Sequence, residues 1–327
     1  MNLPQIHSIT KKILVAVIAA FLMIFLLFHA CANLCILRND EGAWYNAFCH
    51  FMGTNLFIKI FEVILLACFL IHMCLTLWLV ITNRRARGTE RYHQPSKTKT
   101  HPFSKLMPWT GVLILLLLFV HFHDFYFVKL GWIPGNYMVK TEELFSKPEL
   151  NQMVQICQQY NMTPKDYIAA NDQQLEQVKS QGQIGEEELA EINAQLDKLR
   201  ELVPVADVVI SAQADKKMSE DGKYIQKLSY DERKVINAVY GRGTAEPDFY
   251  HMARVKFTKL YMVLIYLLFF ALVGLHLRHG FSSVFQTLGL NNYKYNKAIE
   301  IIGIIYVWAV CCIFSLVVLC VFIPSLF

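Results

Sequence analysis

Four histidines lie deep inside long apolar stretches of this sequence, where an ionisable side chain is costly. The four stretches are separate, and the third holds a second candidate two positions after the first. An imidazole at such a depth is expected to have a partner. Neutral imidazole is a good ligand for haem iron, so histidines brought together from different helices predict a haem-binding core. The histidines are His29, His72, His121 or His123, and His276.

The stretches that carry these histidines are long enough to cross a membrane, which takes about 20 mostly apolar residues. The chain has 327 residues, of which 55% are hydrophobic and 17% charged, and this composition excludes a disordered tail protein and a basic nucleic-acid binder. We expect an all-α membrane protein, a five-transmembrane-helix bundle. The predicted spans are residues 13–37, 54–82, 109–130, 257–277 and 298–323.

The first span and the cysteines each leave an alternative open. Lys11 and Lys12 precede an apolar run containing Ala-Cys-Ala at residues 30–32, which a signal peptidase could accept, but the run continues to Leu37 and we expect the span to be retained. Seven of the nine cysteines lie in or beside spans without a CxxC pair, so no disulfide framework is indicated. A bridge between Cys49 and Cys157 stays open.

Basic residues predict the orientation of the spans. Residues 83–108 hold seven Lys and Arg against a single acid, Glu90, and this loop is expected in the cytoplasm. The N-terminus and the loop with Arg278, Lys294 and Lys297 then share its side. Residues 38–53 and the C-terminus face outward.

The segment between the third and fourth spans differs in composition from both. Residues 136–256 hold 15 Lys plus Arg and 20 Asp plus Glu, a net charge of −5, so the remainder of the chain carries +10. We expect transmembrane helices in 1–135 and 257–327, with a small, mostly helical extracytoplasmic domain in 136–256. A spacer or docking surface without chemistry is its favoured interpretation.

Local signals inside this segment indicate helices. Thr163-Pro164 is a helix start, with a capping residue followed by proline in the first turn. Gly241 to Gly243 marks a break before the chain returns to the membrane. An apolar stripe at helical spacing is formed by Leu189, Ile192, Leu196 and Leu199.

With the orientation set, the histidines sort into two pairs by depth. His29 lies 16 residues beyond residue 13 and His121 lies 12 beyond residue 109, which places them ~24 and ~18 Å from the cytoplasmic face. His72 and His276 lie 18 and 19 residues beyond the outer ends of their spans, ~27 and ~28 Å down and near the inner face. Each pair comes from two helices, as two stacked, axially ligated haems require. Interhelical hydrogen bonding of each histidine is the alternative.

Two further histidines, His123 and His279, lie close in sequence to the predicted ligands. His123 lies about 200° around the helix from His121, so only one of the two can face a given ring. His279 follows His276 by one turn at the inner boundary, where a contact with a haem propionate and a solvated surface position are equally compatible. The sequence has no phosphate-binding glycine loop, HExxH metal motif or nucleophile elbow.

At these residues the sequence resembles the five-helix, dihaem cytochrome b subunit that anchors bacterial succinate:quinone reductases and quinol:fumarate reductases. The most specific match is GLHLRHGFSSVFQTLGL at residues 274–290, which is similar to the family's fourth-helix run HLxHGFxSAFQTLGL. The other matches are LLFHACANL around His29, NAFCHFM at 46–52, LIHM around His72 and TGVLILLLLFVH at 110–121.

The resemblance implies ligands, cofactors and partners. His72 and His276 would ligate the inner haem b and His29 and His121 the outer one, which selects His121 over His123. A flavoprotein with covalent FAD and a three-cluster iron-sulfur protein would dock on the cytoplasmic face of the bacterial inner membrane, with a dimer of this heterotrimer left open. The dicarboxylate site lies in those partners, so this chain would be a quinone-reactive subunit of the enzyme.

The resemblance also implies quinone chemistry, with menaquinone or another quinone, near the outer haem. A carboxylate or imidazole is needed there because protons accompany the electrons. His50 is the first candidate for this role and Glu41 the second. An interfacial position without chemistry is the alternative for His50.

Two departures and two rival functions accompany this interpretation. Some family members have a glutamate two residues before the fourth-helix ligand, whereas this chain has Gly274, and the long segment 136–256 is unusual for the family. The first rival is a haem b subunit of another quinone-linked oxidoreductase, of the formate dehydrogenase or hydrogenase type. The second is a five-helix sensor or transporter whose histidines only pack.

Overall fold

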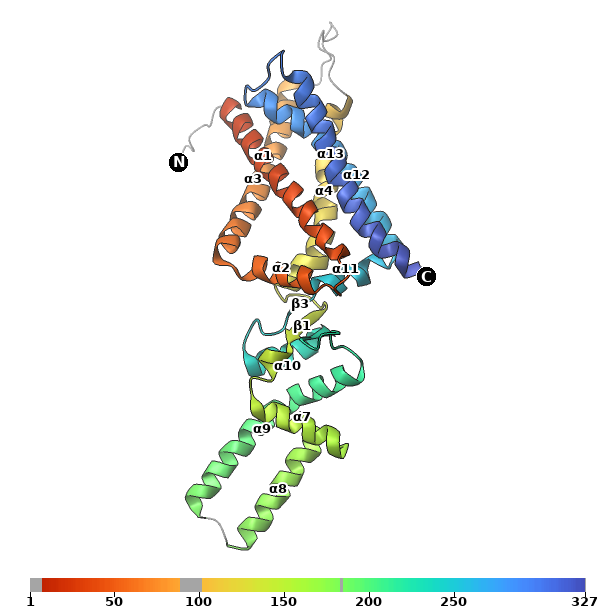
Figure 1. Ribbon diagram of the computed structural model, residues 1–327. Coiled ribbons are helices and arrows are strands. Elements are labelled where there is room, and N and C mark those ends of the chain that lie inside the picture. The colour runs from red at the N-terminus through yellow and green to blue at the C-terminus, as the bar shows by residue number, and fades with distance from the viewer. Residues whose placement is uncertain (1–7, 89–101, 183–184, 327) are drawn as a thin grey trace, which may run out of the picture. The chain divides into compact units, whose positions relative to one another are not determined.

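The computed structural model describes residues 8–88, 102–182 and 185–326. Contacts within the chain divide it into two compact units, each of which is described by itself. Unit 1 comprises Met1–Phe122 and Ala253–Phe327, and unit 2 comprises His123–Met252. Figure 1 shows the long helices of unit 1 and the shorter elements of unit 2 along the chain.

Long apolar helices make up unit 1. They are α1 (Ser8–Asn33), α3 (Leu56–Arg87), α4 (Pro102–His121), α12 (Leu260–Thr287) and α13 (Asn296–Phe322). A 3-10 turn, Leu34–Leu37, extends α1, and α4 continues through a π-helical turn, Phe122–Tyr126, into α5 (Phe127–Lys129). Two shorter helices, α2 (Ala43–Thr54) and α11 (Phe249–Phe257), precede α3 and α12, and a 3-10 turn, Ile323–Leu326, follows α13.

Five of these elements are long and apolar enough to cross a membrane, which confirms the five predicted spans. Their bounds are Ile9–Leu37, Leu56–Ala86, Leu106–Lys129, Leu260–Thr287 and Asn296–Phe322. The second span begins later than expected because Thr54 ends α2, and the Asn55 side chain caps α3 by accepting from the backbone N–H of Phe57 and Ile58. The fourth span runs ten residues beyond the expected end at Leu277. These helices indicate a membrane protein.

Small residues let α12 and α13 pack closely along their length, as Figure 1 shows for the two blue helices. A Cβ atom added to Gly274 would lie 2.9 Å from Cys311 Sγ, and one added to Gly303 would lie 2.8 Å from Phe281 Cδ1. Both distances are shorter than side chains tolerate. The helix pair is therefore specified by glycine on one helix facing a larger side chain on the other.

Hydrogen bonds between helices supplement this packing. The Tyr306 hydroxyl of α13 donates to the carbonyl of Met23 in α1 at 2.8 Å, and the Cys311 thiol lies 3.4 Å from the Phe270 carbonyl of α12. Toward the ends of α12 and α13, Arg278 and Glu300 form an ion pair at 3.2 Å. Contacts also join α12 to α4 and to α1. Helix α12 is thus the central element of the unit.

Helix α3 packs against α1 and α2 and leaves much of its apolar surface exposed. Phe57 is 81% exposed, Val63 67% and Trp78 58%. Lipid chains solvate such a surface, whereas water would not. This exposure is the arrangement expected of a peripheral helix in a membrane bundle.

Unit 2 is built on a three-stranded antiparallel sheet that the sequence analysis did not predict. Strand β1 (Tyr137–Lys140) lies between β2 (Tyr224–Leu228) and β3 (Glu246–Pro247). Tyr137 pairs with Leu228 and with Pro247, and a bulge between Tyr137 and Val139 shifts the register. The central strand comes from the start of the unit and both edge strands from its end.

Helices fill the interval between β1 and β2, and Figure 1 shows the two longest, α8 and α9, side by side. The predicted helix start is confirmed: Thr163 and Asp166 form a capping box at the beginning of α8. The apolar stripe lies in α9, with Leu196 buried, and α10 ends before Gly241 as expected. The helices between β1 and β2 are α6 (Thr141–Leu144), α7 (Pro148–Tyr160), α8 (Pro164–Ser180) and α9 (Glu186–Ala214), and α10 (Tyr230–Tyr240) lies between β2 and β3.

The core of unit 2 contains one of the nine cysteines. Cys157 is 2% exposed and packs with the buried side chains of α7 and α9. Burial raises the pKa of this thiol, with smaller contributions from Asp207 and Asp166. All nine cysteines lie in the described residues and none of them forms a disulfide, so the structure contains no Cys49 to Cys157 bridge.

We predict that Gly274→Ala destabilises unit 1 whereas Gly280→Ala does not. Both glycines lie in α12, and alanine improves the helix propensity of each by up to about 1 kcal/mol. Only the Gly274 variant places a methyl group against Cys311, since nothing lies within 4 Å of a Cβ at Gly280. Overpacking of this kind costs ~1–3 kcal/mol. Thermal unfolding of the detergent-solubilised protein should show the Gly274 variant below the Gly280 variant, and equal midpoints would contradict the packing argument.

Candidate functional site

Two of the predicted histidines meet in unit 1. His29 lies near the end of α1 and His121 is the last residue of α4. Their ring centroids are 6.0 Å apart and their planes are inclined by 77°. His29 lies eight residues before its span ends at Leu37, and His121 lies eight residues before its span ends at Lys129. Both histidines are therefore about 12 Å from the ends of their spans. The structure thus places these imidazoles edge to face at equal depth.

Aromatic side chains enclose this histidine pair. Phe25 stacks on His29 with ring centroids 5.5 Å apart, and Phe314 of α13 lies 5.7 Å from the same ring. Tyr266 of α12 lies 6.3 Å from the His121 ring. The surroundings exclude water on several sides, which strengthens any electrostatic interaction made there.

The helix changes geometry directly after His121. Residues Phe122–Tyr126 form a π-helical turn, a feature that frequently occurs at functional sites. The His123 side chain is 62% exposed, and its Nδ1 lies 3.3 Å from the carboxylate of Asp124, which is buried. Of the two neighbouring histidines, His121 is therefore the one next to His29.

A hydrogen-bonded chain joins the backbone of His29 to helix α2. The Tyr45 hydroxyl donates to Asn33 Oδ1 at 3.0 Å, and Asn33 Nδ2 donates to the His29 carbonyl at 2.7 Å and lies 3.5 Å from His29 Nδ1. Burial of Tyr45 raises its pKa, with smaller contributions from Cys49 and Cys35, so the phenol keeps its proton. Sequence reasoning missed both partners, although Asn33 lies one helical turn after His29.

His276 has a side-chain partner on another helix. Its Nδ1 lies 3.1 Å from the hydroxyl oxygen of Thr110 in α4, and Thr110 is 6% exposed. The Thr110 hydroxyl also lies 3.1 Å from the carbonyl of Met107. A Cβ added to Gly111 would lie 3.6 Å from His276 Cε1, so this glycine faces the same ring. The sequence analysis assigned no role to Thr110 or Gly111.

His72 is the counterpart of His276 by position along its helix. His72 lies 16 residues after Leu56, the first residue of α3, and His276 lies 16 residues after Leu260, the first of α12, which is ~24 Å in each case. His72 Nδ1 is buried and has no hydrogen-bond partner. The described contacts include no ring contact between the two. The pair shares a depth without touching.

The remaining predicted site residues, His50, Glu41 and His279, lie outside these two histidine pairs. His50 lies half-buried in α2, and Glu41 lies exposed in the turn before it with φ at 50°. His279 is half-buried on α12, close enough that its charge would act on His276. The structure therefore places His50 and Glu41 on the same connection as Tyr45, between α1 and α3.

The separation of the His29 and His121 rings is close to that of two imidazoles that hold one metal. A ligating imidazole nitrogen lies about 2 Å from its metal and roughly 1 Å from the centre of its own ring, so two imidazoles on opposite sides have centroids about 6 Å apart. The observed separation matches this value. The described residues contain no group of three or more His, Cys, Asp or Glu suited to a metal ion.

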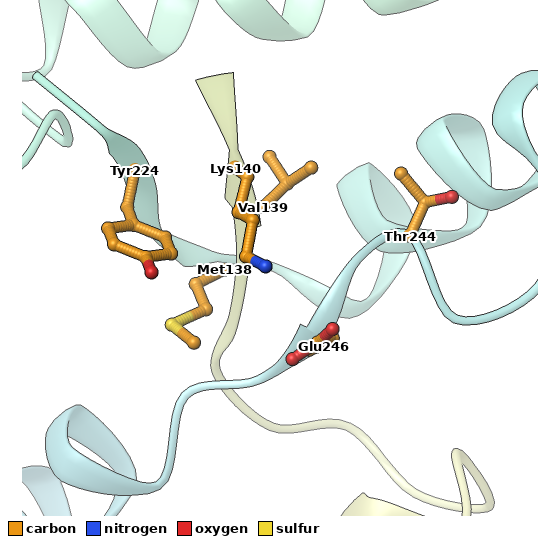
Figure 2. A pocket seen from close by; sticks show the side chains of 6 residues that line it. All are labelled: Met138, Val139, Lys140, Tyr224, Thr244 and Glu246. Atoms are coloured by element: carbon orange, nitrogen blue, oxygen red, sulfur yellow. The ribbon is translucent and has the colours of Figure 1, made fainter. Parts of the chain in front are cut away.

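A small pocket in unit 2 offers no alternative site. Figure 2 shows it on the three-stranded sheet, with an empty volume of ≈ 170 Å³. Its lining includes none of the predicted site residues. The lining residues are Met138, Val139, Lys140, Tyr224, Thr244 and Glu246.

Comparison with known proteins adds no relative. No protein-family model matches the chain, and neither a curated protein nor a solved structure matches it. The function therefore has to be argued from the residues and their geometry.

We predict that Tyr45→Phe destabilises unit 1 by about 0.5–1.5 kcal/mol, because the half-buried Asn33 Oδ1 loses its donor. Tyr293→Phe is the matched control, since Tyr293 is 98% exposed. Thermal midpoints in detergent compare the two variants. Equal midpoints would show that the Tyr45 hydroxyl contributes nothing to the anchoring of Asn33.

Proposed function

We propose that this protein is the cytochrome b membrane anchor of a succinate:quinone reductase or quinol:fumarate reductase, with two haems b held by histidine pairs. The observation that carries the proposal is the His29 to His121 contact at 6.0 Å between the ends of two apolar helices. Two imidazole ligands of one iron require a separation of this size, and the two rings come from different helices. The sequence similarity around all four histidines supports the same function.

His72 and His276 form the second pair in this proposal. The Nδ1 atoms of these two histidines differ in their hydrogen bonding. His276 Nδ1 has Thr110 as its partner, whereas His72 Nδ1 is buried without a partner. His72 and His276 lie at equal depth along α3 and α12, which supports a single haem held between them. His279, one turn after His276, is placed to hydrogen-bond a propionate.

The chain supplies positions and surroundings for electron transfer. When bound, haem supplies the one-electron chemistry. His29 and His121 hold the outer group, His72 and His276 the inner one, and the aromatic side chains around His29 exclude water. Near the outer pair, His50 exchanges the proton that accompanies quinone reduction or quinol oxidation at its imidazole nitrogen, and the Glu41 carboxylate is the second candidate.

The proposed topology follows from the basic loops. Residues 83–108 and the connection between α12 and α13 face the cytoplasm, where the flavoprotein and the iron-sulfur protein dock. Residues 136–256 and the C-terminus face the periplasm of a bacterial inner membrane. Arg84 and Arg85 at the end of α3 supply positive charge to the docking side.

Two measurements on the complex purified from its native membranes test the proposal. We expect a reduced-minus-oxidised spectrum with b-type haem bands, together with copurification of a flavoprotein that oxidises succinate or reduces fumarate. A chain with haem bands that copurifies with formate dehydrogenase or hydrogenase subunits instead would assign the rival respiratory function. A chain without haem bands would leave only the sensor or transporter.

We predict that His121→Ala removes one of two haems, whereas His123→Ala leaves haem content unchanged. His121 faces His29, and the side chain of His123 is 62% exposed. Haem per polypeptide, measured by the pyridine haemochrome spectrum, should fall by half in the first variant alone. Full haem content in His121→Ala would remove it from the ligand set.

We predict that His50→Gln impairs quinone turnover by 10-fold or more while succinate still reduces an artificial dye, because a general acid-base group contributes ~10²–10⁴-fold. The dye accepts electrons from the partner subunits without the quinone site. Parallel assays on the same membranes separate the two activities. Equal loss of both would indicate failed assembly and would count against the proton role.

A further inference from the structure

The Thr110 hydroxyl connects α4 to the ring of His276 on α12. Thr110 is buried in the bundle, with Oγ1 3.1 Å from His276 Nδ1 and 3.1 Å from the Met107 carbonyl. In the described part of the chain, no hydrogen-bond partner of the His276 ring other than Thr110 occurs. A hydroxyl has one proton to donate and lone pairs to accept.

The Thr110 hydroxyl donates its one proton to the Met107 carbonyl, as threonine in a helix commonly does to the preceding turn. The hydroxyl oxygen then accepts from His276, which requires a proton on Nδ1. A neutral imidazole with its proton on Nδ1 has the lone pair on Nε2.

We propose that Thr110 is a positioning residue that holds His276 in the tautomer whose Nε2 is free to bind iron. This inference rests on the proposed function, since it assigns the side chain that orients one of the four proposed ligands. Outer hydrogen bonds of this kind fix the ring of a metal-binding histidine and raise its basicity. Gly111, the next residue, allows the ring to lie against α4, because its missing side chain faces His276 Cε1.

The two proposed ligands of the inner haem, His276 and His72, differ in whether a hydrogen bond fixes the tautomer of the ring. His72 Nδ1 is buried without a hydrogen-bond partner, so nothing in the described chain fixes its tautomer. Thr76, one turn further along α3, donates to the carbonyls of His72 and Met73 at 2.7 and 3.0 Å and does not contact the ring. The inner site thus has one oriented ligand, His276, and one whose ring lacks this support.

Thr110→Val tests the assignment, with Thr110→Ser as the conservative variant and Thr76→Val as the matched control. Valine keeps the shape of threonine and removes the hydroxyl, serine keeps the hydroxyl, and Thr76→Val removes a hydroxyl that bonds only to backbone. All variants are made in the full complex. The haem component missing from His72→Ala identifies the inner haem, and the outer haem serves as the internal reference for correct folding.

The readouts are the rate of haem transfer to excess apomyoglobin and the midpoint potential of the inner haem. We expect Thr110→Val to lose the inner haem about 10- to 100-fold faster and to shift its potential upward, because a less basic imidazole stabilises ferric iron less well. The outer haem should be unaffected. Thr110→Ser and Thr76→Val should both behave as the unsubstituted protein.

Failure of this inference is distinct from failure of the proposed function. An unchanged loss rate and potential in Thr110→Val, in a complex that holds two haems, overturns the role of Thr110 alone. Equal loss of both haems in Thr110→Val also overturns it, because the effect would then be structural. An unsubstituted complex without haem overturns the proposed function, and the inference with it.

Discussion

The cost of placing an imidazole in hydrocarbon is the constraint on which the interpretation of this protein depends. Each of four spans carries a histidine eight or more residues from its ends, where most of the surrounding side chains are apolar and offer no hydrogen bonds. Three of these imidazoles contact groups that can offset the cost of burial. His29 and His121 lie against each other, and His276 has Thr110 as a hydrogen-bond partner. His72 keeps a buried nitrogen without a partner. Metal ligation would relieve this constraint for all four through a common mechanism.

Much of the fold followed from local patterns, because span length and helix capping are short-range properties. The five apolar helices and the capping box at Thr163 were predictable for this reason. The sheet of unit 2 was not, since β1 pairs with strands that follow it by more than eighty residues. Within the site, the depths of the histidines could be estimated from the rise of a helix. Thr110 and Tyr45 instead form hydrogen bonds to residues of other helices. Periodicity within one helix does not predict contacts between different helices.

Close helix packing also bears on one departure from the family that the sequence resembles. A Cβ atom at Gly274 would lie 2.9 Å from Cys311 Sγ, so a side chain at this position would force Cys311 or α13 to shift. The chain has instead a tight glycine contact between α12 and α13, two residues before His276.

The haem content of the chain purified from its native membranes tests the central claim most directly. Iron and protoporphyrin are measured against polypeptide, and low-temperature electron paramagnetic resonance reports the axial ligands. The account predicts two haems b for each chain, both low-spin with two imidazole ligands. A preparation with intact chain and no haem would contradict it, as would high-spin iron with a single histidine ligand.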